Sequence, residues 1–160
     1  MLDRWLVVVV FAASLGSGLI AGVFFAFSTF VMRALARRPV AEGVAAMQAI
    51  NVTVINPLFL GTFLGTAVAC GPAIIGAWLQ WDRPGAGWVL AGALCYLVGT
   101  FGLTLACNVP LNNALAGVAP TGSDAARIWS HYLSRWTMWN HVRTGAALAA
   151  SGAFVVALRR

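Results

Sequence analysis

The sequence has 160 residues, of which 61% are hydrophobic and only 9% charged, whereas soluble domains carry about 25% charged residues. Together with a mean hydropathy of +0.85, this composition excludes an ordinary soluble protein and indicates an integral membrane protein. The net charge of +6 comes from arginines without any lysine; because they mostly stand at the ends of apolar runs, we assign them to lipid headgroups and expect no nucleic-acid partner.

The first apolar run predicts a transmembrane helix over residues 5–32. It is longer than the apolar segment of a signal peptide, so we expect an uncleaved span. Arg33 is the first charged residue after this run, and Pro39 disfavours a helix through that point. A short amphipathic segment over residues 40–55 is expected to follow.

The second and third spans are predicted over residues 57–80 and 87–108. Asn56 and Pro57 have the form of an N-cap followed by a proline at the first helical position, so the second span should begin there. At the end of the third span, Pro110 removes a backbone donor and predicts a break or a kink.

The last helix is predicted to begin near Ala125, after a loop over residues 113–124, with Ser123 or Asp124 as its N-cap. It should start at the membrane surface and cross the bilayer over residues 136–158. The fold class is therefore an all-α membrane protein, a single domain over residues 1–160 that forms an antiparallel four-helix bundle with both termini on one side. We expect it in the bacterial inner membrane. Arginines flank both sides, so the orientation stays open.

Small residues recur at every fourth position on three of the predicted helices, and such ridges let helices approach closely. The ridges are Ser14, Gly18, Gly22 and Ala26; Gly61, Gly65 and Ala69; and Gly145, Ala149 and Ala153. We expect them to mediate helix packing, with a homo-oligomer as a second use. Cys70, Cys95 and Cys107 lie in apolar runs and predict neither a disulfide nor a zinc site.

One helical face near the C-terminus combines aromatic and polar side chains. On a helix, the spacing of three, four, seven, eleven and fourteen residues aligns Trp129, Tyr132, Trp136, Asn140 and Arg143, here called the stripe. An arginine carried into a membrane is costly unless it faces protein or a water-filled cavity, so the stripe indicates a functional site. The alternative is an interfacial anchor.

The antiparallel topology predicts that further polar residues meet the stripe at one end of the bundle. The residues expected to surround this end are Asn51, Asn56, Asn108, Asn112, Asn140, His141 and Arg143, beneath Trp129, Tyr132, Trp136 and Trp139. Aromatic walls with a few polar groups are typical of a small-molecule pocket. The alternative is that the asparagines only cap helices and cross-link the bundle.

His131 and His141 are the only histidines. Their separation along the chain places them roughly 80° apart around a helix, and neither lies on the stripe. A bis-histidine ligand pair is therefore not favoured. His141, beside Asn140, is the better candidate for a proton acceptor, although it could instead pack between helices. No acidic residue lies inside a span and no His-x-x-x-His motif occurs, so we predict no metal site.

Four motifs together resemble the anthrone-oxygenase-like family of small membrane proteins. They are Gly22-Val-Phe-Phe-Ala-Phe-Ser28, Met47-Gln-x-Ile-Asn51 before Asn56-Pro57, Asn108-Val-Pro-Leu-Asn112, and Trp136-Thr-x-Trp-Asn-x-x-Arg-Thr144. The resemblance covers nearly the whole chain. It implies oxidation of polyketide anthrones to anthraquinones by O2 without a recognised cofactor.

The chemistry of anthrones turns this resemblance into a hypothesis about residues. An anthrone has an acidic C–H, and its delocalised anion can itself reduce O2, so the protein need supply only a base, an anion-stabilising site and a dry aromatic pocket. We assign His141 as the base; Arg143, Asn140, Asn108 and Asn112 as donors to the anion; Trp136 and Trp139 as walls; and Asn51, Asn56 and Tyr132 as further substrate contacts.

Expected partners are a small aromatic molecule, O2 and the lipid bilayer. Two other hypotheses about the function stay open. The protein could be a quinone- or haem-binding membrane module, or a non-enzymatic membrane subunit that packs through its small-residue ridges.

Overall fold

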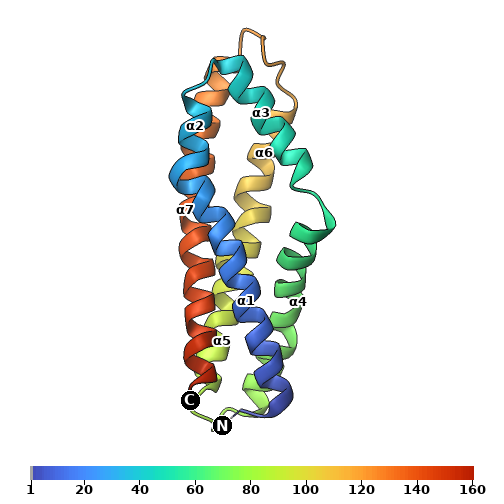
Figure 1. Cartoon of the computed structure of the whole chain (residues 1–160), viewed down its shortest axis with the longest axis vertical. Coiled ribbons are helices and arrows are strands. Elements are labelled where there is room, and N and C mark those ends of the chain that lie inside the picture. The colour runs from blue at the N-terminus through green and yellow to red at the C-terminus, as the bar shows by residue number, and fades with distance from the viewer. Residues whose placement is uncertain (1) are drawn as a thin grey trace.

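The computed structural model describes residues 2–160, which are built from helices and short connecting segments. Four helical stretches are long and apolar enough to cross a membrane: Arg4–Ala36, Pro57–Leu79, Ala86–Ala116 and Ala125–Leu158. They run antiparallel, and both chain ends lie at the same end of the bundle (Figure 1). The predicted all-α, four-helix membrane bundle is therefore confirmed.

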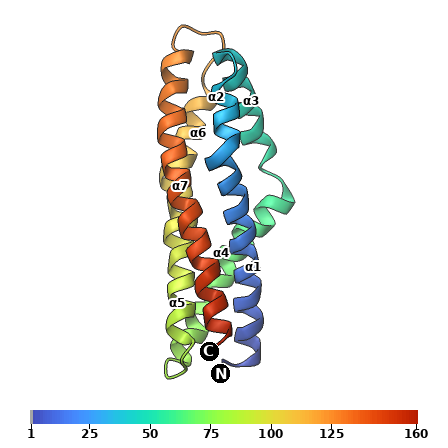
Figure 2. The same cartoon turned by 60° about the vertical axis from the view of Figure 1, so that its left-hand side comes forward.

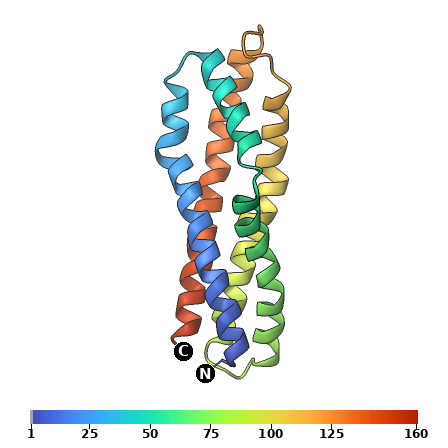
Figure 3. The same ribbon diagram turned by 45° about the vertical axis from the view of Figure 1, so that its right-hand side comes forward.

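The first stretch extends beyond residue 32, where its end was predicted. It consists of α1 (Arg4–Ala26), a π-helical turn η1 (Phe27–Val31) and α2 (Met32–Ala36). The helix passes through Arg33 and stops just before Pro39, which occupies the N-cap of α3 (Val40–Thr53). A charge is tolerated where a helix leaves the membrane, whereas proline disfavours the helical conformation in the residue before it. α3 then folds back toward the middle of the molecule (Figure 3).

The second span, α4 (Pro57–Leu79), begins at the predicted residue. Asn56 Oδ1 accepts hydrogen bonds from the backbone N–H groups of Leu58 and Phe59 at 3.1 and 3.0 Å. Pro57 fills the first helical position, where no N–H is required. The predicted cap is therefore confirmed, and it commits the Asn56 side chain to the end of α4.

The third stretch continues past Pro110, so the predicted end at residue 108 was wrong. It consists of α5 (Ala86–Leu94), the π-helical segments η2 (Cys95–Gly102) and η3 (Thr104–Asn108), and α6 (Val109–Ala116). Pro110 lies in the first turn of α6, where the backbone N–H need not bond within that helix. The preceding π-helical turns change the bonding register, so the helix accommodates the proline instead of breaking.

The fourth stretch is one helix, α7 (Ala125–Leu158), and it begins where predicted. Asp124 occupies the N-cap position, but its side chain accepts from Arg127 Nη2 at 3.2 Å rather than from the helix backbone. The 34 residues of α7 span roughly 51 Å, more than the ~30 Å hydrocarbon core of a bilayer. Figure 2 shows α7 running the length of the molecule, so the helix is longer than the part of it that the hydrocarbon core can enclose.

The apolar interior is divided into two clusters. The terminal core, nearest the chain ends, includes Leu6, Val10, Ile20, Phe24, Phe63, Tyr96 and Phe154. The distal core contains Met32, Val44, Met47, Leu115, Trp129, Tyr132 and Trp136. α3 covers the distal core and is held there by Gln48, whose Nε2 donates to the backbone oxygens of Leu115 and Val118 at 2.9 Å each.

Helix packing uses only part of the predicted small-residue ridges. Ser14 bonds to Ser151 of α7 and Gly18 lies close to the same residue, but Gly22, Gly61, Gly65 and Gly145 have open space where a side chain would lie. The closest approach is instead at Gly16, where a Cβ would lie 2.0 Å from Thr66 Oγ1. Gly16 is two residues from both Ser14 and Gly18, about 200° of rotation, so this close contact lies on nearly the opposite face of the helix from the predicted ridge. The cysteines are free thiols, with Cys70 buried in the terminal core.

Candidate functional site

A layer of buried polar side chains separates the terminal core from the distal core. Its members come from η1, η3 and α7: Ser28, Asn108, Asn140, Arg143 and Thr144 are buried, and Thr104 is half-buried. On each of these helical stretches, terminal-core residues lie on one side of the layer and distal-core residues on the other. Polar groups in such a position must find partners within the protein or in a ligand.

Arg143 is the central cation of the layer and is only 3% exposed. Its Nη1 donates to Thr104 Oγ1 at 3.0 Å, and its Nη2 donates to Asn140 Oδ1 at 2.6 Å. The guanidinium carbon lies 4.1 Å from the centroid of the Phe24 ring and 5.2 Å from that of the Trp136 ring. These ring faces contribute cation–π attraction to a charge that is largely removed from water.

No carboxylate neutralises Arg143 within residues 2–160. The two ion pairs of this part of the chain join Arg38 to Glu42 and Arg127 to Asp124, all of them exposed. A buried charge without an opposite charge costs several kcal/mol, of order 3–5 when one partner of a pair is missing. The layer therefore holds a positive charge inside the bundle that no negative side chain of these residues compensates.

Asn140 is fully buried and fixes the orientation of Arg143. Its Nδ2 donates to Phe24 O and to Ser28 Oγ, both at 2.7 Å, at the junction of α1 and η1. These two bonds turn Oδ1 toward the guanidinium. Thr144 Oγ1 donates to the Asn140 carbonyl at 2.8 Å and lies 3.3 Å from Ser28 Oγ. A continuous set of hydrogen bonds thus connects Ser28 to Arg143 through one amide.

Asn112 holds the aromatic part of the stripe. Its Oδ1 accepts from Tyr132 Oη at 2.9 Å and from Trp136 Nε1 at 2.8 Å. The rings of Trp129, Tyr132 and Trp136 stack in succession, with centroid distances of 5.7 and 6.0 Å. The stripe is confirmed as one buried face of α7. Its rings, however, form part of the distal core and do not roof an open pocket, and Asn112 satisfies the polar atoms of Tyr132 and Trp136.

Asn108 and Asn51 lie at the edges of these groups. Asn108 Nδ2 donates to Trp136 O at 3.2 Å, while its buried Oδ1 and the Nε of Arg143 have no partner among the described residues. Asn51, in α3, approaches the Tyr132 hydroxyl. Asn108 therefore ties η3 to α7 beside the cation.

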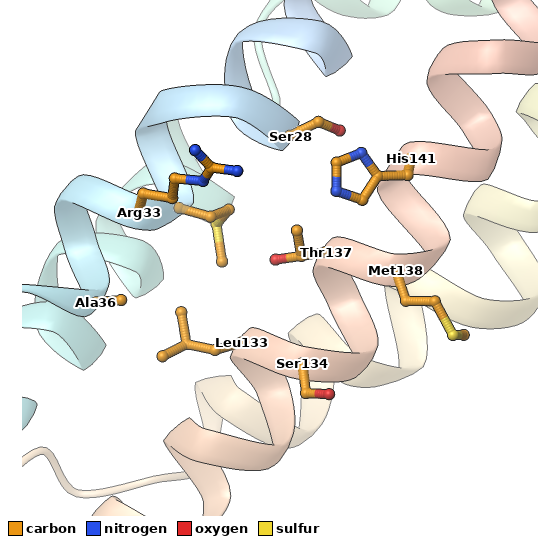
Figure 4. A pocket seen from close by; sticks show the side chains of 9 residues that line it. Ser28, Arg33, Ala36, Leu133, Ser134, Thr137, Met138 and His141 are labelled. Atoms are coloured by element: carbon orange, nitrogen blue, oxygen red, sulfur yellow. The ribbon is translucent and has the colours of Figure 1, made fainter.

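An open groove of about 470 Å³ lies on the outer side of the polar layer, between η1 and α2 on one side and α7 on the other. Its lining residues are Ser28, Met32, Arg33, Ala36, Leu133, Ser134, Thr137, Met138 and His141 (Figure 4). The figure shows Arg33 and His141 facing each other across the groove, with Ser28 beside them. Because Ser28 also binds Asn140, the groove reaches the polar layer at this one residue.

The predicted site residues fall into three places rather than one pocket. The stripe, Asn108 and Asn112 come together inside the bundle. His141 instead lines the outer groove, Asn56 caps α4, and Trp139 is half-buried outside both groups. The single pocket within the bundle that we predicted is thus not what the structure has, since the interior polar groups bond to one another.

Four residues of the site were not predicted from the sequence: Ser28, Arg33, Thr104 and Thr144. Thr104 lies four residues before Asn108, on the same side of the predicted third span, and this spacing was the signal that could have found it. Ser28 and Thr144 are the last residues of two of the motifs that resemble the family, and these motifs were the signal that could have identified both residues. Among residues 2–160, no group of three or more His, Cys, Asp or Glu side chains is placed to hold a metal ion.

Comparison with known proteins identified one matching family model. It is described as anthrone oxygenase, and it matches residues 45–153. The matched range includes Asn108, Asn140, His141 and Arg143, while Ser28 and Arg33 precede it. No curated protein and no solved structure matches the chain.

Proposed function

Since this chain belongs to the anthrone oxygenase family, we propose that it is a membrane-embedded oxidoreductase that oxidises an anthrone-like aromatic substrate with O2 and without a cofactor. One observation supports the proposal beyond family membership: a histidine lines an open groove, and a buried arginine without a carboxylate partner is connected to that groove through Asn140 and Ser28. A base and a fixed positive charge are the two things that the reaction requires of the protein.

The substrate binds in the groove between α2 and α7. The volume of about 470 Å³ falls within the range of roughly 300–1,000 Å³ that is usual for small-molecule sites. Met32, Leu133 and Met138 supply apolar walls for a flat aromatic body. An apolar substrate dissolved in the bilayer can enter such a groove from the side.

His141 takes the first proton. Its neutral imidazole removes a hydrogen from the acidic ring carbon of the substrate, and the electron pair delocalises over the aromatic system and its oxygen. The charge of Arg143 stabilises this anion from behind Ser28. Asn140 and Thr104 hold the guanidinium in place before the anion forms, so little reorganisation is needed during the reaction.

Molecular oxygen then takes electrons from the substrate anion. One electron passes to O2, which leaves a carbon radical and superoxide, and the two combine to form a carbon–oxygen bond. The resulting peroxide anion takes the proton back from the His141 imidazolium. Loss of the second hydrogen from the same carbon as a proton, with cleavage of the O–O bond, releases water and leaves a carbonyl. The balance is CH2 plus O2 to C=O plus H2O.

The remaining residues of the interior position the cation. Asn112 fixes Trp136, and the Trp136 ring in turn faces the guanidinium of Arg143. Asn108 links η3 to the same turn of α7. Asn56 takes no part in the proposal, because its side chain is used to cap α4.

Oxygen uptake by the purified protein in lipid nanodiscs, with an anthrone as substrate, tests this function. We expect Arg143→Met to lower the rate above the uncatalysed background by about 100-fold or more, as loss of a key anion-stabilising donor does. Arg143→Lys should retain part of the rate, because it keeps the charge but not the paired hydrogen bonds. His141→Gln should also abolish catalysis.

His131→Gln is the matched control, since His131 is an exposed histidine on the same helix and outside the groove. It should leave the rate unchanged. Circular dichroism and size-exclusion chromatography establish that each variant is folded. Uptake that persists in folded Arg143→Met protein would contradict the assigned role of the cation.

A further inference from the structure

Arg33 is a second cation at the groove, separate from the buried Arg143. It lies on α2, is exposed, and lines the groove together with His141. Figure 4 shows its guanidinium turned toward the groove rather than away from the helix bundle. The two ion pairs within residues 2–160 use Arg38 and Arg127, so neither engages Arg33.

The lining of the groove combines a positive charge with apolar walls. Met32, Ala36, Leu133 and Met138 are apolar, whereas the polar lining residues are Arg33, His141, Ser28, Ser134 and Thr137. A purely apolar ligand would use the walls but leave the charge in contact with water. A ligand with a flat apolar body and one acidic group would use both.

We infer that the groove selects an aromatic substrate that carries a carboxylate, and that Arg33 is the residue that recognises the negative group. The inference rests on the proposed function, because it assumes that the substrate lies in this groove. A guanidinium presents paired N–H donors that match the two oxygens of a carboxylate. Since Arg33 is exposed, a neutral analogue can bind without leaving a buried, unpaired charge. The groove therefore prefers an acid because the ion pair increases the affinity for the acid, and not because binding of neutral ligands is weakened.

The charge pattern supports a carboxylate near Arg33 and not near Arg143. Arg143 contacts Phe24, Trp136 and Asn140 and does not line the groove, to which it is connected through Asn140 and Ser28. Arg33 has no such cover. A permanent anionic group of the ligand therefore meets Arg33, while the charge that develops during the reaction is stabilised by Arg143.

Two nearly isosteric ligands test this assignment without relying on turnover. Anthraquinone-2-carboxylate and the neutral anthraquinone-2-carboxamide are titrated against the protein in phosphatidylcholine nanodiscs by equilibrium dialysis. We expect the wild type to bind the carboxylate roughly two- to fivefold more tightly, as one exposed ion pair provides. Arg33→Gln should bind both ligands equally, with its affinity for the carboxamide unchanged.

Arg37→Gln provides the control, because Arg37 is an exposed arginine just beyond α2 that does not line the groove. It should keep the wild-type preference. Equal affinities in the wild type, a preference that survives in Arg33→Gln, or no binding of either ligand would each overturn the inference. So would displacement of the carboxylate by short-chain phosphatidylglycerol but not by short-chain phosphatidylcholine, which would identify a lipid phosphate as the ligand of Arg33. Because no oxidation is measured, a protein that shows the preference but consumes no oxygen would refute only the proposed oxygenase activity.

Discussion

Arg143 and Asn140, one helical turn apart on α7, bond through Nη2 and Oδ1 at 2.6 Å, while the amide nitrogen of Asn140 binds α1 and η1. One amide side chain thus orients a buried cation and joins two membrane-spanning helices. This arrangement means that the stability of the bundle and the position of the charge depend on the same residue.

Replacement of Asn140 should therefore cost more stability than replacement of an ordinary polar residue. Asn140→Ala leaves the guanidinium, Phe24 O and Ser28 Oγ each short of a partner, and we expect a loss of about 2–4 kcal/mol in unfolding free energy. Asn113→Ala, at an exposed asparagine of α6, should stay within about 0.5 kcal/mol of the wild type. Reversible unfolding in mixed micelles measures both; equal stabilities would show that the Asn140 bonds do not matter.

Asn112 should be coupled to the two aromatic residues that it binds. Asn112→Leu leaves the Tyr132 hydroxyl and the Trp136 indole N–H unpaired in the distal core, so we expect a loss of about 2–4 kcal/mol. Adding Tyr132→Phe removes one of the stranded groups and should recover about 1 kcal/mol relative to the sum of the single changes. A double-mutant cycle on unfolding free energies measures this coupling, and strictly additive effects would argue against the shared acceptor.

Gly16 should be the least replaceable glycine of α1. The Cβ of an alanine there would meet Thr66 Oγ1 at 2.0 Å, so α1 and α4 must separate, and we expect Gly16→Ala to destabilise the protein by about 1–3 kcal/mol. Gly22→Ala is the matched control on the same helix, where nothing lies within 4 Å of the added carbon. Thermal unfolding should separate the two variants. Thr66→Ala, combined with Gly16→Ala, should recover part of the loss.

Asn56 should matter for helix stability and not for oxygen uptake. Asn56→Ala removes the acceptor for the Leu58 and Phe59 N–H groups, which should cost about 1 kcal/mol. Asn56→Ser, which can still cap the helix, should cost less. Oxygen uptake by folded Asn56→Ala protein should equal that of the wild type; a specific loss of activity would place Asn56 at the substrate after all.

The stripe and the Asn56 cap could be predicted because both depend on local geometry. Helical periodicity aligns Tyr132 with Arg143, and a cap needs only the residues next to it. The passage of the third helix through Pro110 could not be predicted, since whether proline breaks a helix depends on π-helical turns in the preceding segment. Thr104 lay inside the predicted third span, but its contact with Arg143 depends on how the third and fourth helical stretches pack together.

The position of His141 relative to Asn140 could not be predicted from their adjacency in the sequence. Periodicity correctly turned it away from the stripe, but its sequence neighbour Asn140 suggested that both would meet one ligand. A rotation of about 100° between adjacent helical residues instead directs Asn140 inward and leaves His141 at the outer groove.

The sequence by itself determined the membrane class, the presence of four spans and the shared helical face of Tyr132 and Arg143, because hydropathy and helical period are properties of single segments. Only the tertiary structure decided which groups surround that arginine, since Ser28, Thr104 and Asn140 come from three different helical stretches. It also decided that Arg33 and His141 face each other across a groove, because their separation in space is set by the packing of α2 against α7 and not by any spacing along the chain.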